Sequence, residues 1–187
     1  MRILFVFLIL TLACSPARER EGNQKLVEAV FEIDESLIST SPYFLYDSAI
    51  QYQVPNSWIE SNANFDELMR PGVQSVFVSG SDSSILVVGQ FEGKLSNVSF
   101  EPDTTDLNAK FTETSFLTND FEVKQGLLQK QDIINFKLYF DAPAISNGFY
   151  FEFYVKPSLF DETIKSIESS IGSIKFVNQI KSNYEKN

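Results

Sequence analysis

The chain has 187 residues, with 25 Asp and Glu against 15 Lys and Arg, and a net charge of −10. Because nucleic-acid binding depends on Lys and Arg that neutralise phosphates, and anionic membrane surfaces attract basic clusters, this charge argues against both partners for the folded surface. The chain has no histidine and one cysteine, which excludes zinc sites, Cys–His pairs and Ser–His–Asp triads, and we expect no cofactor.

The first 13 residues form a short apolar leader, with Arg2 before a hydrophobic run from Ile3 to about Leu12. A membrane-spanning helix needs about 20 apolar residues, so this shorter run is typical of a signal peptide. The run Thr11-Leu12-Ala13-Cys14 resembles the lipobox of bacterial lipoproteins, although Thr11 and Leu12 depart from the usual residues of that motif.

The resemblance implies that residues 1–13 are removed and that Cys14 is lipidated. An ordinary secretory signal is the alternative, but lipidation also accounts for an odd cysteine. By the same resemblance, Ser15 after the cysteine implies the outer membrane of a diderm bacterium, and therefore the cell envelope. Residues 14–25 then form the lipidated cysteine and a polar, flexible tether.

Residues 26–177 are predicted to form a single α/β domain. Apolar residues at Leu26, Val30, Ile33 and Leu37 recur at helical spacing and predict an amphipathic helix over 26–37, although residues 27–31 also suit an extended segment. The next predictions are strands at 43–46 and 50–54, a turn at 55–58, a short helix at 64–70, and strands at 73–78 and 84–91.

Residues 95–119 show no clear pattern apart from a polar loop at 101–106 and a single helical turn. In contrast, residues 136–141 and 149–156 alternate strictly between apolar and polar side chains. This period of two predicts paired antiparallel strands with one buried face.

The best helix pattern follows that hairpin. Pro157 and Ser158 predict its start, with Asp161 completing a capping box, and Gly172 suits the position just past its end. The apolar stripe of this helix consists of Phe160, Ile164, Ile167 and Ile171. A short strand at 173–177 and a polar tail at 178–187 complete the predicted elements.

Two features resemble the PsbP-like family: the strand Ile50–Val54 that ends at Pro55 with Trp58 nearby, and the closing hairpin, helix and strand over 149–176. This superfamily includes a photosystem oxygen-evolving subunit, a Ran-binding nuclear-transport factor and bacterial lipoproteins, DcrB-like ones among them. The resemblance covers about residues 40–177. It implies an α+β fold, with an antiparallel β-sheet flanked by helices in an α/β/α sandwich, and a largely non-enzymatic role.

Two groups of residues are candidate sites. Glu101, Asp103 and Asp106 share one loop and are weak calcium candidates, but the loop lacks the residue order of an EF-hand, so a solvated acidic loop is the favoured interpretation. Tyr43, Tyr46 and Trp58 are candidates for a partner or ligand surface, with packing at the edge of the core as the alternative.

Three functions remain open. The leading hypothesis is a non-catalytic binding or assembly domain for another envelope protein, which the acidic surface predicts to carry a basic patch. The second is a carrier for a small apolar ligand, with a pocket between sheet and helices. The third, a carboxylate-dependent envelope hydrolase, requires two Asp or Glu facing each other across a cleft; no residue is assigned as catalytic.

Overall fold

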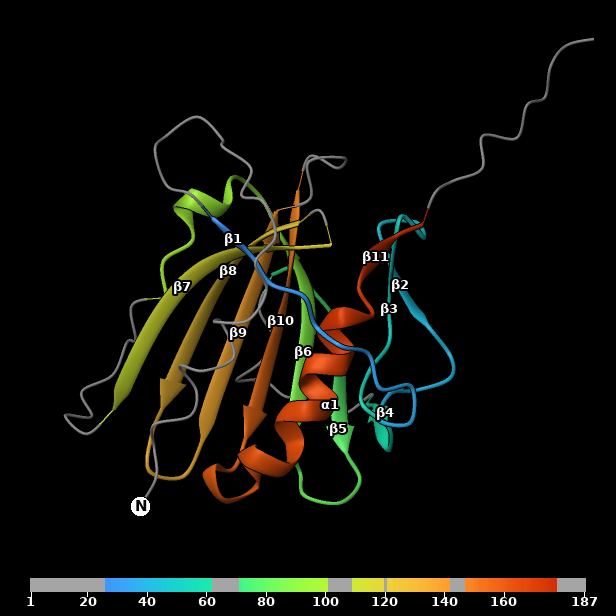
Figure 1. Ribbon diagram of the computed structural model, residues 1–187, viewed down its shortest axis with the longest axis vertical. Coiled ribbons are helices and arrows are strands. Elements are labelled where there is room, and N and C mark those ends of the chain that lie inside the picture. Colours follow the sequence, from blue (N-terminus) through green and yellow to red (C-terminus); the bar gives the residue numbers. More distant parts are fainter. Residues whose placement is uncertain (1–25, 62–70, 101–108, 120, 142–146, 178–187) are drawn as a thin grey trace, which may run out of the picture.

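The computed structural model describes residues 26–61, 71–100, 109–119, 121–141 and 147–177. Within these ranges the chain forms two β-sheets and one α-helix (Figure 1). The strands are β1 (Val27–Glu28), β2 (Tyr43–Leu45), β3 (Ile50–Tyr52), β4 (Trp58–Glu60), β5 (Val73–Ser79), β6 (Ile85–Phe91), β7 (Lys110–Thr118), β8 (Phe121–Gln129), β9 (Ile134–Asp141), β10 (Gly148–Val155) and β11 (Lys175–Phe176). The helical elements are the 3-10 turns η1 (Leu95–Asn97) and η2 (Pro157–Leu159) and the helix α1 (Phe160–Gly172).

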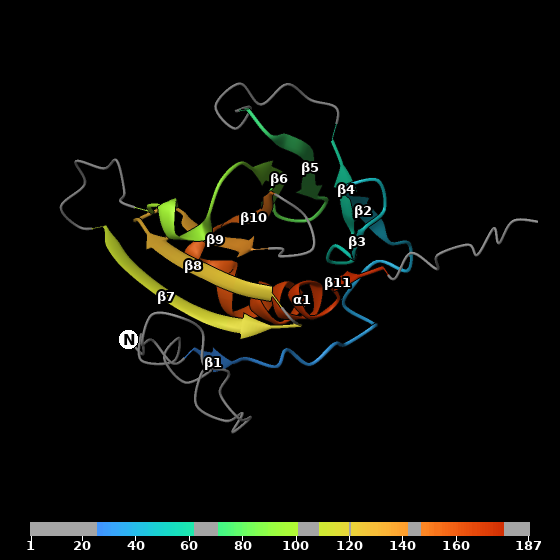
Figure 2. The ribbon, with the colours of Figure 1, turned by 90° about the horizontal axis from the view of Figure 1, so that it is seen from above.

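The larger sheet has eight strands in the order β1-β7-β8-β9-β10-β6-β5-β4, and the smaller has three in the order β11-β3-β2. All pairs are antiparallel except β1 with β7. Seen from above, the larger sheet curves around α1 (Figure 2). We call the face toward α1 the inner face and the opposite one the outer face. The predicted α+β class with a mainly antiparallel sheet is confirmed.

The predicted hairpin is the centre of the larger sheet. In β9 and β10, Phe136 lies opposite Phe153 and Phe140 opposite Phe149. These rings point to the inner face, because alternate residues of a strand face opposite sides. The predicted strand pairing and the buried phenylalanine face are therefore confirmed, but the opposite face of β10 is buried as well, at Tyr150 and Glu152.

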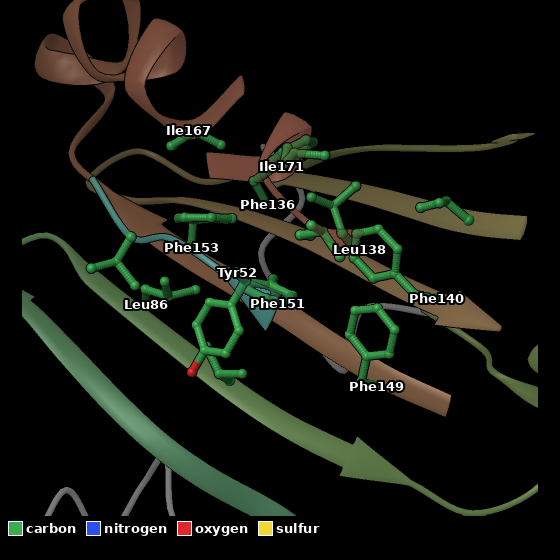
Figure 3. Packing of buried hydrophobic residues seen from close by; sticks show 14 of the residues in the cluster. Tyr52, Leu86, Phe136, Leu138, Phe140, Phe149, Phe151, Phe153, Ile167 and Ile171 are labelled. Carbon is green, nitrogen blue, oxygen red and sulfur yellow. The ribbon is translucent and has the colours of Figure 1, made fainter. Parts of the chain in front are cut away.

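Aromatic rings fill the space between the inner face and α1 (Figure 3). The rings of Phe140 and Phe149 stack with centroids 4.6 Å apart, and the edge of Tyr52 from the smaller sheet meets Phe151 at 5.1 Å. Ile167 and Ile171 of α1 pack against these rings and complete the core (Figure 3). The smaller sheet and α1 thus share one core with the larger sheet.

The helix α1 confirms the predicted helix but not its predicted ends. Ser158 lies in η2 rather than at an N-cap, and the N-cap residue Leu159 makes no side-chain capping bond. Gly172 is the last helical residue rather than the one beyond it. A side chain at Gly172 would bring its Cβ to 2.9 Å from the carbonyl oxygen of Phe31, so close approach of the N-terminal segment explains this glycine.

The helix predicted over residues 26–37 is wrong. Val27 and Glu28 form a strand beside β7, and the amide of Ala29 donates to the carbonyl oxygen of Leu117 at 2.7 Å. The rest of the segment runs across the C-terminal end of α1, where the amide of Asp34 donates to Ser169 Oγ at 3.1 Å. The residues of this segment are rich in Val, Ile and Phe, which favour extended backbone, and packing against the core decides the outcome.

The other segments outside the hairpin agree with the sequence predictions only in part. The strands β4, β7 and β8 were not predicted from the sequence, whereas the single helical turn in 95–119 is confirmed as η1. The helix expected at 64–70 lies outside the described residues. Of the helical layers implied by the resemblance, the described ranges contain only the one formed by α1 on the inner face.

The loop between β2 and β3 has an unusual backbone. Tyr46, Asp47 and Ser48 adopt φ values of 52°, 50° and 73°, a left-handed conformation that costs L-residues about 1–2 kcal/mol each. The amide of Ala49 closes this turn on the carbonyl oxygen of Tyr46 at 2.9 Å.

Replacing the exposed Ser48 with glycine is expected to raise the free energy of unfolding by about 1 kcal/mol, because glycine adopts positive φ without steric cost. Ser48→Ala, which keeps a Cβ, is the matched control and should show no gain. Urea denaturation followed by circular dichroism measures both. Equal stabilities for the two variants would contradict the backbone explanation.

Candidate functional site

The three aromatic residues predicted as a partner surface pack inward instead of lying open. Trp58 is 7% exposed, and the half-buried Tyr43 meets the edge of Phe77 with ring centroids 4.7 Å apart. The hydroxyl of Tyr46 donates to the carbonyl oxygen of Gly148 at 2.6 Å, and burial raises the pKa of Tyr46 to about 12.

The neighbours of these residues in the sequence are the exposed ones. Phe44 in β2 is 48% exposed and Ile59 in β4 is 65% exposed. Strand alternation explains this pattern, because each lies on the opposite side of its strand from an inward-facing aromatic. Both strands lie at the end of their sheets, on the same side of the molecule (Figure 2).

Other sequence-based candidates fall outside the described residues. Cys14 with the leader and tether, and the calcium candidates Glu101, Asp103 and Asp106, all belong to that group. Within the described ranges, no three acidic or cysteine side chains gather closely enough to hold a metal ion. None of the helices in those ranges has the length and apolar character needed to cross a membrane.

The outer face carries a carboxylate that sequence reasoning did not single out. Glu152 in β10 is fully buried, and its two carboxylate oxygens accept hydrogen bonds from the hydroxyls of Tyr139 at 2.9 Å and Tyr154 at 3.0 Å. A buried charge is tolerated only when hydrogen bonds or an opposite charge compensate for lost hydration. The two phenols supply that compensation.

Aromatic rings cover this carboxylate from one side. Tyr139 stacks on Tyr150 with ring centroids 5.1 Å apart and also meets Phe91 and Phe100, each at 5.2 Å. Phe100 follows η1 in the chain and is 5% exposed. These contacts hold the ring of Tyr139 in place beside Glu152.

Beside this cluster lies an open hollow of about 360 Å³, which we call the outer-face depression. Strands β7 to β10, the turn between β8 and β9, and the chain after η1 supply the residues that line it: Ser99, Phe100, Phe111, Gly126, Leu128, Lys130, Ile133, Asn135, Lys137 and Tyr154. Tyr154 belongs to both features, because its ring lines the depression while its hydroxyl bonds to Glu152.

The register of the sheet brings these residues together from distant parts of the chain. Phe111, Leu128, Asn135 and Tyr154 lie opposite one another in a single row across β7, β8, β9 and β10. The sequence could have revealed part of this row, because the register of the predicted hairpin pairs Asn135 with Tyr154. The sequence did not reveal the contribution of β7, because apolar and polar residues do not alternate along this strand.

The described residues resemble known structures in fold rather than in sequence. No protein-family model matches the chain, and no curated protein matches it in sequence. The solution structure of cyanobacterial PsbP (CyanoP) from Synechocystis sp. PCC 6803 superposes with a TM-score of 0.52 at 10% identity, over 73% of this chain and 92% of that one. The fold is PsbP-like.

A second similar structure is the Ran-binding protein Mog1p of Saccharomyces cerevisiae, with a TM-score of 0.46 and 10% identity over 73% of this chain and 95% of that one. The superposition on CyanoP confirms the PsbP-like fold indicated by the strand–proline–tryptophan motif and the closing hairpin and helix. At this identity the likeness concerns fold alone, because one fold supports many functions.

Proposed function

We propose that this PsbP-like domain belongs to a lipoprotein of the bacterial cell envelope, held in the outer membrane of a diderm bacterium by lipid on Cys14, and that it binds another envelope protein without catalysing a reaction. The leader and the lipobox-like residues before Cys14 support the anchor. The proposal also includes the finer fold implied by the resemblance, an antiparallel sheet flanked by helices in an α/β/α sandwich.

One observation carries the binding role: exposed apolar side chains lie on the strands that end the two sheets. Ile59 and Phe44 are more exposed than the apolar residues around them. Strand edges present unpaired backbone groups that favour association with another chain, and aromatic residues are enriched in protein interfaces. We therefore place the partner surface at β4 and β2.

The test is crosslinking in native membranes, comparing the unchanged chain with the Ile59→Lys and Phe44→Lys variants. We expect both variants to lose the crosslinked envelope partner, because a lysine on the surface must be desolvated when the partner binds. Val30→Lys is the matched control, since Val30 is 67% exposed and lies in the N-terminal segment; it should keep the partner.

Localisation needs a separate experiment. Cys14→Ser should move the protein from the membrane fraction to the soluble fraction, because the two or more acyl chains of a lipoprotein give stable anchoring. A Cys14→Ser protein that stays in the outer-membrane fraction would contradict the anchor. A partner captured equally by the Ile59→Lys, Phe44→Lys and Val30→Lys variants would contradict the surface.

A further inference from the structure

We propose that the outer-face depression binds a small organic acid, whose carboxylate is held by Lys130, Lys137 and Asn135 and whose apolar part lies against Phe100 and Phe111. This ligand site is separate from the partner surface proposed at β4 and β2, and its evidence does not depend on that surface. The argument rests on the charge of the lining, one buried amide and the shape of the walls.

The lining is basic in a chain of net charge −10. Lys130 and Lys137 both line the depression, and none of the described residues that line it is acidic. Lys124 on the same face shows the contrast, because it forms an ion pair with Glu113 at 3.1 Å and donates to the carbonyl oxygen of Val98.

The side chains of Lys130 and Lys137 make no such ion pair or hydrogen bond with the rest of the described chain. Glu152 lies opposite Lys137 in β10. Both oxygens of Glu152 already accept hydrogen bonds from tyrosines. The two lysines thus retain donors for an incoming anion.

Asn135 supplies the second, independent observation. Its side chain lines the depression and is only 5% exposed, yet its Nδ2 has no hydrogen-bond partner among the described residues. Leaving a buried donor unsatisfied costs about 1–3 kcal/mol, and such groups are rare in folded proteins. A ligand oxygen in the depression would satisfy this donor.

The remaining walls are apolar and closely packed. The ring of Phe100 lies on the backbone of Gly126, where an added Cβ would come within 2.9 Å of it. Phe111 and Leu128 continue this wall along β7 and β8. The volume of about 360 Å³ is near the lower limit for small-molecule sites, about 300–1,000 Å³. The site therefore suits a compact molecule with one anionic and one apolar end.

The test is calorimetric titration of the lipidated protein in nanodiscs with 4-phenylbutanoate, using empty nanodiscs as the blank. The neutral isostere 4-phenylbutanamide should bind at least about tenfold more weakly, because hydrogen bonds to a charged group are the stronger ones. Lys130→Ala and Lys137→Ala should each weaken 4-phenylbutanoate binding by about tenfold. Lys175→Ala, which removes an exposed lysine in β11, is the matched control and should bind as the unchanged protein does.

The melting temperature of Asn135→Leu distinguishes a ligand-binding role of the amide from a purely structural one, because the two roles predict changes of opposite sign. If the amide serves a ligand, this variant binds 4-phenylbutanoate more weakly and melts about 2–4 °C higher without ligand, because an unpartnered polar group has left the interior. A lower melting temperature would mean that the amide stabilises the fold itself.

Three results would overturn the proposal. The first is equal affinity for 4-phenylbutanoate and its amide, and the second is unchanged binding in both Lys130→Ala and Lys137→Ala. The third is displacement of 4-phenylbutanoate by inorganic phosphate at lower concentrations than the acid itself requires, which would assign the depression to phosphate instead.

Discussion

Replacing Phe151 with alanine is expected to lower the free energy of unfolding by about 3–5 kcal/mol. The Phe151 ring is fully buried and meets Tyr52 at 5.1 Å and Phe140 at 5.8 Å. Removing the ring leaves a cavity between the two sheets, and the surrounding side chains cannot fill it without moving one sheet relative to the other. Domains of this kind are stable by about 5–15 kcal/mol in total, so this single change removes a large fraction of that stability.

Urea denaturation followed by tryptophan fluorescence measures this effect, because the buried Trp58 reports on the same core. Ile59→Ala, at a 65% exposed position, is the control and should change stability by less than about 0.5 kcal/mol. A loss below about 1 kcal/mol for Phe151→Ala would show that the two sheets do not share one cooperative core.

The second large effect concerns the hydrogen bonds to Glu152. Tyr154→Phe keeps the ring and removes the donor 3.0 Å from the carboxylate, so we expect a loss of about 1.5–3 kcal/mol, the range for hydrogen bonds to charged groups. Tyr139→Phe removes the other donor, at 2.9 Å, and should cost a similar amount.

A double-mutant cycle separates this bond from the packing of the ring. In the Glu152→Gln background the acceptor is neutral, so Tyr154→Phe should cost only about 1 kcal/mol. The difference between the two backgrounds is the coupling energy between the Tyr154 hydroxyl and the charge of Glu152. If Tyr154→Phe costs the same in both backgrounds, the hydroxyl stabilises the fold through another contact.

The predictable parts of the fold were those with local, periodic patterns. The alternating phenylalanines of β9 and β10 and the isoleucine stripe of α1 each define a buried face within one element. The strand β7 has no such pattern, because Thr and Ser follow Phe111 on both of its faces. Its place in the sheet comes from pairing with β8 along its whole length, which a local pattern does not reveal.

In the N-terminal segment, by contrast, a clear local pattern predicted the wrong structure. Leu26, Val30, Ile33 and Leu37 have helical spacing, yet long-range pairing with β7 and packing over Gly172 override that local preference. The outer-face depression was missed, and the partner surface was predicted only in part, for a related reason. The outer-face depression takes residues from four strands, the turn between β8 and β9, and the chain after η1. The inward orientation of Tyr43 and Trp58 depends on what each strand packs against.

Under the lipid anchor proposed at Cys14, the short strand β1 has a mechanical consequence. A pull from the membrane reaches the domain at residue 26 and therefore loads β1 before any other element. Two residues of β1 pair with the outermost long strand β7, so little backbone bonding resists peeling. The first step under tension is thus release of β1, which uncovers Ala29 and Phe31 from the core while the long strands stay paired. With the proposed anchor, we therefore expect the domain to yield to membrane motion at its margin without unfolding.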